Sequence, residues 1–164
     1  MERRQEIIDW LNDIHAMERA LEITLEKQAH NHDLHQAIRV RAGIHLDETR
    51  AHAEQIERCL RMLGAEPSKL KTAAARTLEL ARSITTIFAS DERVKDYLAA
   101  TGEEHFEVAC YKALIAAAGD AHEDAIIPLL QHNLKEDQAM ARWLDDNIEV
   151  VVRDYFRTAA AAVR

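Results

Sequence analysis

Turn-forming and aromatic residues are scarce in this chain of 164 residues. It contains only 4 glycines and 2 prolines, and aromatic residues make up 5% of it. Because glycine and proline supply many tight turns, their scarcity predicts long uninterrupted helices. The few aromatics and the net charge of −8 argue against a nucleic-acid partner, since binding phosphates requires clustered Lys and Arg.

Long apolar runs and cysteine clusters are also missing. No stretch approaches the roughly 18 apolar residues that span a bilayer, and the N-terminal residues lead into an amphipathic segment rather than a signal-peptide core. The 2 cysteines, Cys59 and Cys110, form neither a CxxC pair nor a disulfide scaffold. We therefore expect buried thiols in a cytoplasmic protein that has neither a membrane nor a nucleic-acid partner.

Apolar residues recur at helical spacing along most of the chain. Spacings of three, four and seven residues are typical of amphipathic helices. The ranges expected to be helical are about 6–29, 34–63, 70–88, 92–118 and 122–147. Residues 1–147 should form one helical bundle, and residues 148–164 a helix and tail of the same domain.

Local signals place the ends of several of these helices. Asp33 is a candidate N-cap of the second helix, and Gly64 is well placed just beyond its C-terminus. Asp120-x-x-Glu123 resembles a capping box before the last bundle helix, whose first turns Pro128 should disturb.

The lengths of the connections predict the topology. A short turn after the first helix makes the first two helices antiparallel neighbours, whereas a long connection precedes the third bundle helix. Two helical hairpins joined by one long crossover are the ferritin-like arrangement. We predict an all-α, ferritin-like antiparallel four-helix bundle, with a long helical crossover between helices 2 and 3 and an extra C-terminal helix.

Four of these segments carry acids and histidines at helical spacing. The groups are His15-x-x-Glu18, His45-x-x-Glu48-x-x-x-His52, Glu104-His105-x-Glu107 and His132-x-x-x-Glu136. Positions three or four apart project from nearly the same side of a helix, so each group forms a stripe. Helical bundles build two-metal carboxylate sites from such stripes when they face one interior.

One or two residues of each stripe are candidate metal ligands. They are Glu18, Glu48, His52, Glu104, Glu107 and Glu136. Glu18 lies among apolar positions and should face inward, with a boundary acid that reaches water as the alternative. For the second stripe, a solvated acidic face beside a core histidine is an equally good interpretation. Glu104 and Glu107 share one face, and acids so close repel each other unless a metal or an arginine neutralises them.

The stripes depart from the usual pattern of di-iron bundles, in which Glu-x-x-His pairs supply ligands. Thr49 stands three residues before His52, and Ala139 stands three residues after Glu136. Asp137 follows Glu136 directly and is expected to point elsewhere. The predicted site is therefore rich in carboxylates and poor in histidine ligands.

The sequence does not decide the roles of several neighbouring side chains. Tyr111 lies one turn beyond Glu107 and either hydrogen-bonds a ligand carboxylate or is a core tyrosine with another partner. The sequence does not decide whether His15, His45 and His132 bind metal.

Three segments together resemble a known family. Residues 45–58, 104–111 and 129–144 are similar, in order, to the YciE/YciF family of ferritin-like bacterial proteins, and the resemblance extends over about residues 7–147. It implies a ferritin-like bundle, a homodimer and a dinuclear iron-type site near the candidate ligands. The family is linked with stress responses.

Carboxylate-rich sites suit iron and manganese. The leading hypothesis is a metal-binding protein with a di-iron or iron/manganese site, zinc being a further option, that oxidises Fe(II) or disposes of peroxide. In it, Glu48 or Glu107 bridges the metals, His52 is a terminal nitrogen ligand and Tyr111 tunes the site. The alternative is a non-catalytic helical stress protein that acts through dimer or partner contacts.

Overall fold

The computed structural model describes residues 2–68 and 92–162. Its elements are the helices α1 (Glu2–His30), α2 (Gln36–Met62), α4 (Glu92–Asp120) and α5 (Ile127–Ala162) and the 3-10 helix η1 (Asp124–Ile126). These ranges contain no strand, and none of their helices is long and apolar enough to cross a membrane. The predicted all-α class is confirmed.

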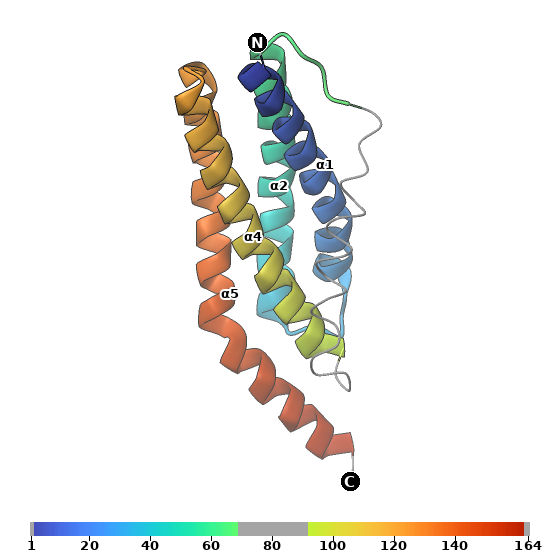
Figure 1. Cartoon of the computed structure of the whole chain (residues 1–164). Coiled ribbons are helices and arrows are strands. Elements are labelled where there is room, and N and C mark those ends of the chain that lie inside the picture. Colours follow the sequence, from blue (N-terminus) through green and yellow to red (C-terminus); the bar gives the residue numbers. More distant parts are fainter. Residues whose placement is uncertain (1, 69–91, 163–164) are drawn as a thin grey trace.

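The four long helices form two antiparallel hairpins, α1 with α2 and α4 with α5 (Figure 1). In Figure 1, α2 ends beside the start of α1, whereas α4 begins at the opposite end of the bundle. The end of α2 and the start of α4 therefore lie at opposite ends of the bundle, as in the ferritin-like connectivity that the sequence predicted. The connecting helix expected at residues 70–88 lies outside the described residues.

The ends of α2 are capped by short-range hydrogen bonds. Gly64 has a φ of +75° and lies just beyond the helix, as predicted. Its N–H donates to Arg61 O (3.0 Å), and the next N–H donates to Leu60 O (2.9 Å), which together make a Schellman motif. The predicted N-cap at Asp33 is wrong, because Nδ1 of His35 accepts a hydrogen bond from the N–H of Ala37 (3.2 Å) instead.

The connection from α4 to α5 differs from the prediction. The helix α4 continues to Asp120, and His122, two residues beyond its end, has a φ of +58°. The predicted capping box does not form, since the Glu123 side chain makes no capping bond and pairs with Arg4 (3.2 Å). Pro128 is the second residue of α5, where the helix requires no N–H donor.

The last helix is longer than predicted. The sequence suggested a helix ending near residue 147 and a further terminal helix, but α5 runs without interruption from Ile127 to Ala162. In Figure 1 its C-terminal part turns and extends below the other helices. Ile148 and Val151 continue its apolar stripe by packing with Val94 and Tyr97 of α4.

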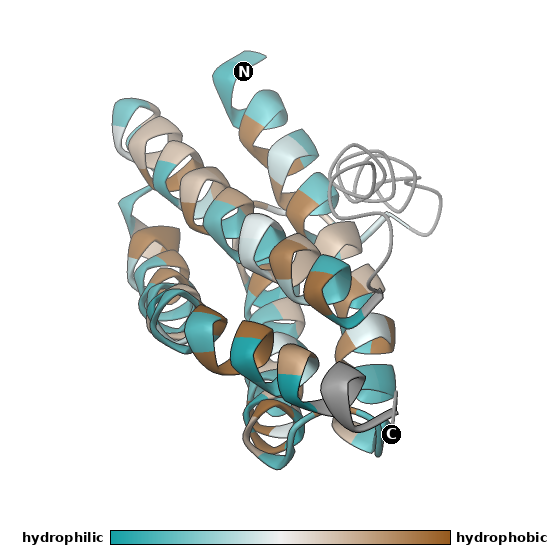
Figure 2. Ribbon diagram, turned by 90° about the horizontal axis from the view of Figure 1, so that it is seen from below, coloured by the Kyte–Doolittle hydropathy of each residue, from teal (hydrophilic) through white to brown (hydrophobic). Residues whose placement is uncertain are grey.

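The hydrophobic core is divided along the bundle axis. Brown and teal segments alternate along the helices in Figure 2, as expected for helices with one buried and one exposed face. The largest cluster includes the fully buried Leu11, Leu60, Leu114 and Leu130, near the start of α1 and the end of α4. A smaller cluster surrounds Tyr97 near the start of α4. Between these two clusters lies a layer of polar side chains.

Candidate metal centre

A layer of buried acids and histidines crosses the middle of the bundle, with members from all four long helices. Its members are Glu18 of α1, His45 and His52 of α2, Glu104 and Glu107 of α4, and Asp137 of α5, and none is more than 4% exposed. We call these six residues the buried acid–histidine layer. Ionisable groups buried this deeply are costly unless they are paired, protonated or bound to a metal.

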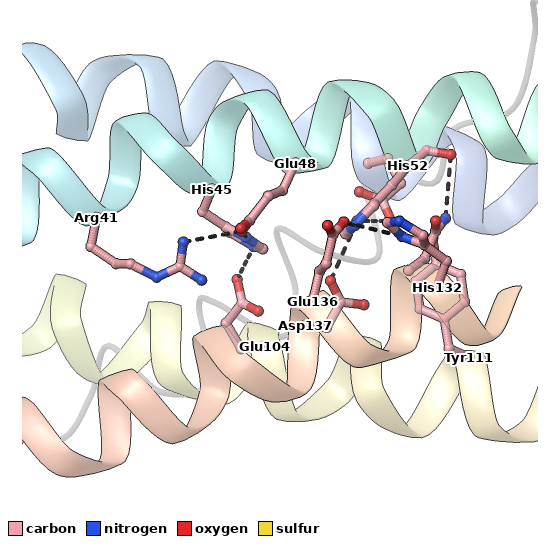
Figure 3. Close-up of polar contacts among 11 residues, drawn as sticks. Arg41, His45, Glu48, His52, Glu104, Tyr111, His132, Glu136 and Asp137 are labelled. Carbon is pink, nitrogen blue, oxygen red and sulfur yellow. Dashed lines mark hydrogen bonds and ion pairs between the residues drawn. The ribbon is translucent and has the colours of Figure 1, made fainter. Parts of the chain in front are cut away.

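One half of the layer is built around His45 (Figure 3). Its Nε2 lies 2.8 Å from Glu104 Oε1, and its Nδ1 lies 2.8 Å from Glu48 Oε2. Possible ligand atoms of His45, Glu104 and Glu107 all lie within 4.8 Å of one another. One nitrogen and two carboxylates at this separation can converge on a single metal ion.

The other half is built around His52, whose ring centroid is 6.3 Å from that of His45. Its Nδ1 faces two acids, at 3.6 Å from Glu18 Oε1 and 3.4 Å from Asp137 Oδ1. Its Nε2 is 2.8 Å from Glu136 Oε2 (Figure 3). The two halves therefore adjoin and form one continuous site.

Several buried atoms of the layer lack a hydrogen-bond partner within the described ranges. They are Glu18 Oε2, Glu104 Oε2, Glu107 Oε2, Asp137 Oδ2 and His52 Nδ1. Most buried polar atoms in proteins are satisfied, so a group of such atoms in one layer requires an explanation. Carboxylate oxygens and an imidazole nitrogen are the donors that iron and manganese accept, and the residues present therefore fit a metal centre.

The histidines of the layer hold protons. Burial works to lower the pKa of His45, but hydrogen bonds to Glu104 and Glu48 outweigh it and raise this pKa to about 10. For His52, burial likewise opposes the charged form, while Glu18, Asp137 and Glu136 raise the pKa to about 9. Without a metal, both imidazoles are therefore cationic at neutral pH.

Two of the acids also favour the protonated form. Burial, followed by repulsion from Glu18 and other acids, raises the pKa of Glu107 well above its usual value. Burial and the charge of Glu18 raise the pKa of Asp137 to about 8, against the opposing effect of His52. The metal-free layer thus offsets its negative charge with protons.

A chain of hydrogen bonds holds Glu18 from the apolar side. The hydroxyl of Tyr111 donates to Glu18 Oε1 (2.5 Å), and Asn133 Nδ2 donates to the same hydroxyl (2.9 Å). Burial raises the pKa of Tyr111 well above its usual value, so the phenol stays protonated. Of the two alternatives left open for Tyr111, the structure shows the hydrogen bond to a candidate carboxylate.

The structure brings four of the six candidate ligands into the layer. Glu18, His52, Glu104 and Glu107 are buried there. The side chains of the other two candidates lie at its edge and are 24% (Glu48) and 30% (Glu136) exposed. Metal binding by any of the six stays a prediction.

The expectation for Asp137 was wrong, because its side chain points into the layer. The signal was present in the sequence, since Asp137 lies at helical spacing from Leu130, Asn133 and Met140, all of which are buried. The four-residue spacing of His132 and Glu136 instead indicated a different face of α5.

The three histidines for which the sequence did not decide metal binding fall into two groups, inside and outside the layer. His45 belongs to the layer. His15 instead pairs with Glu57 at 3.0 Å between α1 and α2, and the side chain of His132 is 57% exposed, with its Nδ1 3.5 Å from Glu136 Oε2.

This topology, with acids from four helices facing one interior, defines a ferritin-like helical bundle. The structure is similar to that of Desulfovibrio desulfuricans bacterioferritin, described by its diiron site, with a TM-score of 0.72 and 16% identity over 96% of this chain and 88% of that one. It is also similar to the E. coli stress protein YciF, with a TM-score of 0.75 and 23% identity over 92% and 97%.

A further solved structure, of a protein from Xanthomonas campestris pv. campestris, matches with a TM-score of 0.82 and 25% identity over 96% of this chain and 99% of that one. The family model described as a domain of unknown function (DUF892) matches residues 3–157. The chain therefore belongs to this family of YciE/YciF-type ferritin-like proteins.

Proposed function

We propose that this protein binds two metal ions, iron or an iron/manganese pair, in the buried acid–histidine layer and uses them to oxidise Fe(II) or to dispose of peroxide. The observation that carries the proposal is the set of buried carboxylate oxygens without a hydrogen-bond donor. Similarity to a bacterioferritin described by its diiron site supports the choice of metal.

The residues divide between two metal positions. His45, Glu104 and Glu107 would hold one ion, and their donor atoms are already close together. Glu18, His52 and Asp137 would hold the other. Glu107 would be a candidate for a shared ligand, because its buried Oε2 has no hydrogen-bond partner among the described residues and the nearby charges of Glu18, Glu104 and Asp137 raise its pKa. Bound iron would supply redox chemistry with O₂ or peroxide.

The protein's own contribution is to prepare the ligands and to control protons. The hydroxyl of Tyr111 fixes one oxygen of Glu18, which leaves the other oxygen free to bind. Asp137 and the two imidazoles hold protons in the metal-free protein, and these protons must leave when metals bind. Metal affinity should therefore increase with pH.

The proposal is tested by metal content. Protein purified without chelator or affinity tag is reconstituted anaerobically with Fe(II), and its metals are counted by plasma mass spectrometry. We expect about two ions per chain, and loss of at least one ion in Glu107→Gln and in Asp137→Asn. Glu57→Gln is the control, because Glu57 also pairs with a histidine but lies outside the layer.

Less than a few tenths of an ion per chain in the reconstituted parent protein would contradict the proposal. If metals bind, rates of Fe(II) oxidation with O₂ and with peroxide separate the two activities. A higher rate with peroxide would identify peroxide disposal, and a higher rate with O₂ would identify iron oxidation.

A homodimer is part of the proposal. Val40 and Ile44 lie one turn apart on α2 and are both more than half exposed, and apolar side chains in such positions are often covered in oligomers. Light scattering of the eluting protein should give twice the chain mass of 18.7 kDa. A monomer would remove this part of the proposal without affecting the metal site.

A further inference from the structure

Each histidine of the layer lies between acids on its two ring nitrogens. We call the acids that belong to the layer inner acids, and we call Glu48 and Glu136 at its edge outer acids. His45 has Glu104 at Nε2 and Glu48 at Nδ1, each at 2.8 Å. His52 has Glu18 and Asp137 at Nδ1, and Glu136 at Nε2. The same arrangement thus occurs twice, once in each half of the site (Figure 3).

Each outer acid also contacts a second basic residue. Oε2 of Glu48 accepts a hydrogen bond from Arg41 Nη1 (3.0 Å) in addition to its bond with His45. Oε2 of Glu136 lies 3.5 Å from Nδ1 of His132. Both acids therefore connect a buried imidazole to a residue nearer the surface.

We infer that Glu48 and Glu136 are positioning residues that orient the two histidines, and that metals bind His45 through Nε2 and His52 through Nδ1. This inference rests on the proposed function. It reassigns two of the six acids and histidines that the sequence suggested as ligands, and it names the coordinating nitrogen of each ring.

Ring geometry supports this assignment. The two nitrogens of an imidazole point in different directions, so the acid bonded to one nitrogen is separated by the ring from a metal bound to the other. Glu48 is separated in this way from Glu104, and Glu136 is separated from Glu18 and Asp137.

The unpaired atoms support it independently. His52 Nδ1 is fully buried and has no hydrogen-bond partner in the described ranges. The buried carboxylate oxygens without a hydrogen-bond partner in the described part of the chain all belong to inner acids, whereas the side chains of Glu48 and Glu136 are partly exposed to solvent. The unsatisfied atoms thus lie on the inner side of both rings.

The physical role of such an outer acid is well defined. A histidine that ligates a metal through one nitrogen usually donates the other N–H to a carboxylate, which fixes the ring orientation and the tautomer. Removing such a partner typically lowers metal affinity by about 10- to 100-fold without removing the ligand.

The test compares outer and inner acids by metal count and by affinity, with Mn(II) and Fe(II) as probes. In Glu48→Gln and Glu136→Gln we expect the full metal count with affinity lowered by about 10- to 100-fold. Gln keeps an acceptor oxygen, so Glu48→Leu should bind more weakly than Glu48→Gln. Glu107→Gln should lower the count itself, and Glu57→Gln should change neither quantity.

A second readout identifies the nitrogen directly. In protein loaded with Zn(II), which is diamagnetic, nitrogen NMR of the imidazoles should show a proton on Nδ1 of His45 and on Nε2 of His52. The opposite assignment for either ring, or a lower metal count in Glu48→Gln or Glu136→Gln, would overturn the inference while leaving the proposed function intact. A parent protein that binds no metal would overturn both.

Discussion

The apolar end of the bundle and the buried acid–histidine layer next to it are equally buried but opposite in chemistry. Leu60 and Leu114 have no exposed surface, and neither has His52, while Glu18 and Asp137 are only 1% exposed. Burying a leucine stabilises the fold by about 1.5–3 kcal/mol, whereas burying an acid without a partner lowers stability. One region therefore supplies stability, and the other uses part of that stability to maintain a site.

The largest effect on stability should come from the apolar end. Leu114→Ala should lower the free energy of unfolding by about 2–5 kcal/mol, because it leaves a cavity in a closely packed cluster. Urea unfolding of the metal-free protein measures this change, and the metal count of the folded variant should stay at the parent value. A loss below about 1 kcal/mol would show that the leucine cluster is not the stabilising region that we describe.

A smaller loss is expected where the two regions meet. Tyr111→Phe removes the hydroxyl that donates to Glu18 and accepts from Asn133. Leaving buried polar groups unsatisfied typically costs about 1–3 kcal/mol, and urea unfolding again measures the change. If the variant were as stable as the parent protein, the bond between Tyr111 and Glu18 would be unimportant for the fold.

The pH dependence of stability should separate the regions without any mutation. Folding raises the pKa of His52 from 6.5 to about 9 and of His45 to about 10, so their contribution is complete below about 6.5 and is lost as the pH rises towards these values. For Asp137, raised from 3.8 to about 8, the contribution is lost between these two values. All three shifts make the metal-free protein less stable as the pH rises.

Urea midpoints of the metal-free protein measured from pH 6 to pH 10 test this dependence. The midpoint should fall steadily, and Asp137→Asn should reduce the slope in the lower half of this range. Saturating metal should weaken or reverse the trend, because metal binding favours the deprotonated ligands. A midpoint that rises with pH in the metal-free protein would contradict the protonation states described here.

The smallest effect should come from an inner acid in the metal-free protein. Gln is isosteric with the protonated carboxyl that the raised pKa of Glu107 favours. Glu107→Gln should therefore change the free energy of unfolding by less than about 1 kcal/mol at neutral pH, while it lowers the metal count. A larger gain in stability together with an unchanged metal count would favour the non-catalytic alternative.

The sequence predicted the fold well because the fold depends on periodicity and connection lengths. Apolar spacing located the four long helices, and the unequal connections indicated the ferritin-like topology. The details of the helix ends were harder to predict from the sequence. Nothing local distinguishes the N-cap at His35 from the expected one at Asp33, since both residues precede α2 and both side chains can accept a hydrogen bond.

The sequence predicted which helices carry the site, but it did not predict which of the side chains contact one another. Glu104 and Glu107 share a face at a spacing of three, so their burial together follows from helix geometry. The bond between His52 and Glu136 joins α2 to α5 across 84 positions of sequence, and a single sequence does not reveal such a contact. Asp137 was misplaced because the spacing of His132 and Glu136 resembled a ligand pair more closely.

The most direct measurement for the central claim is the anomalous scattering of crystals grown from protein loaded with manganese or iron. We expect two peaks per chain in the buried acid–histidine layer, one bonded to Nε2 of His45 and the other to Nδ1 of His52. A layer without any peak in fully reconstituted protein, or peaks only at surface histidines such as His132, would contradict the central claim.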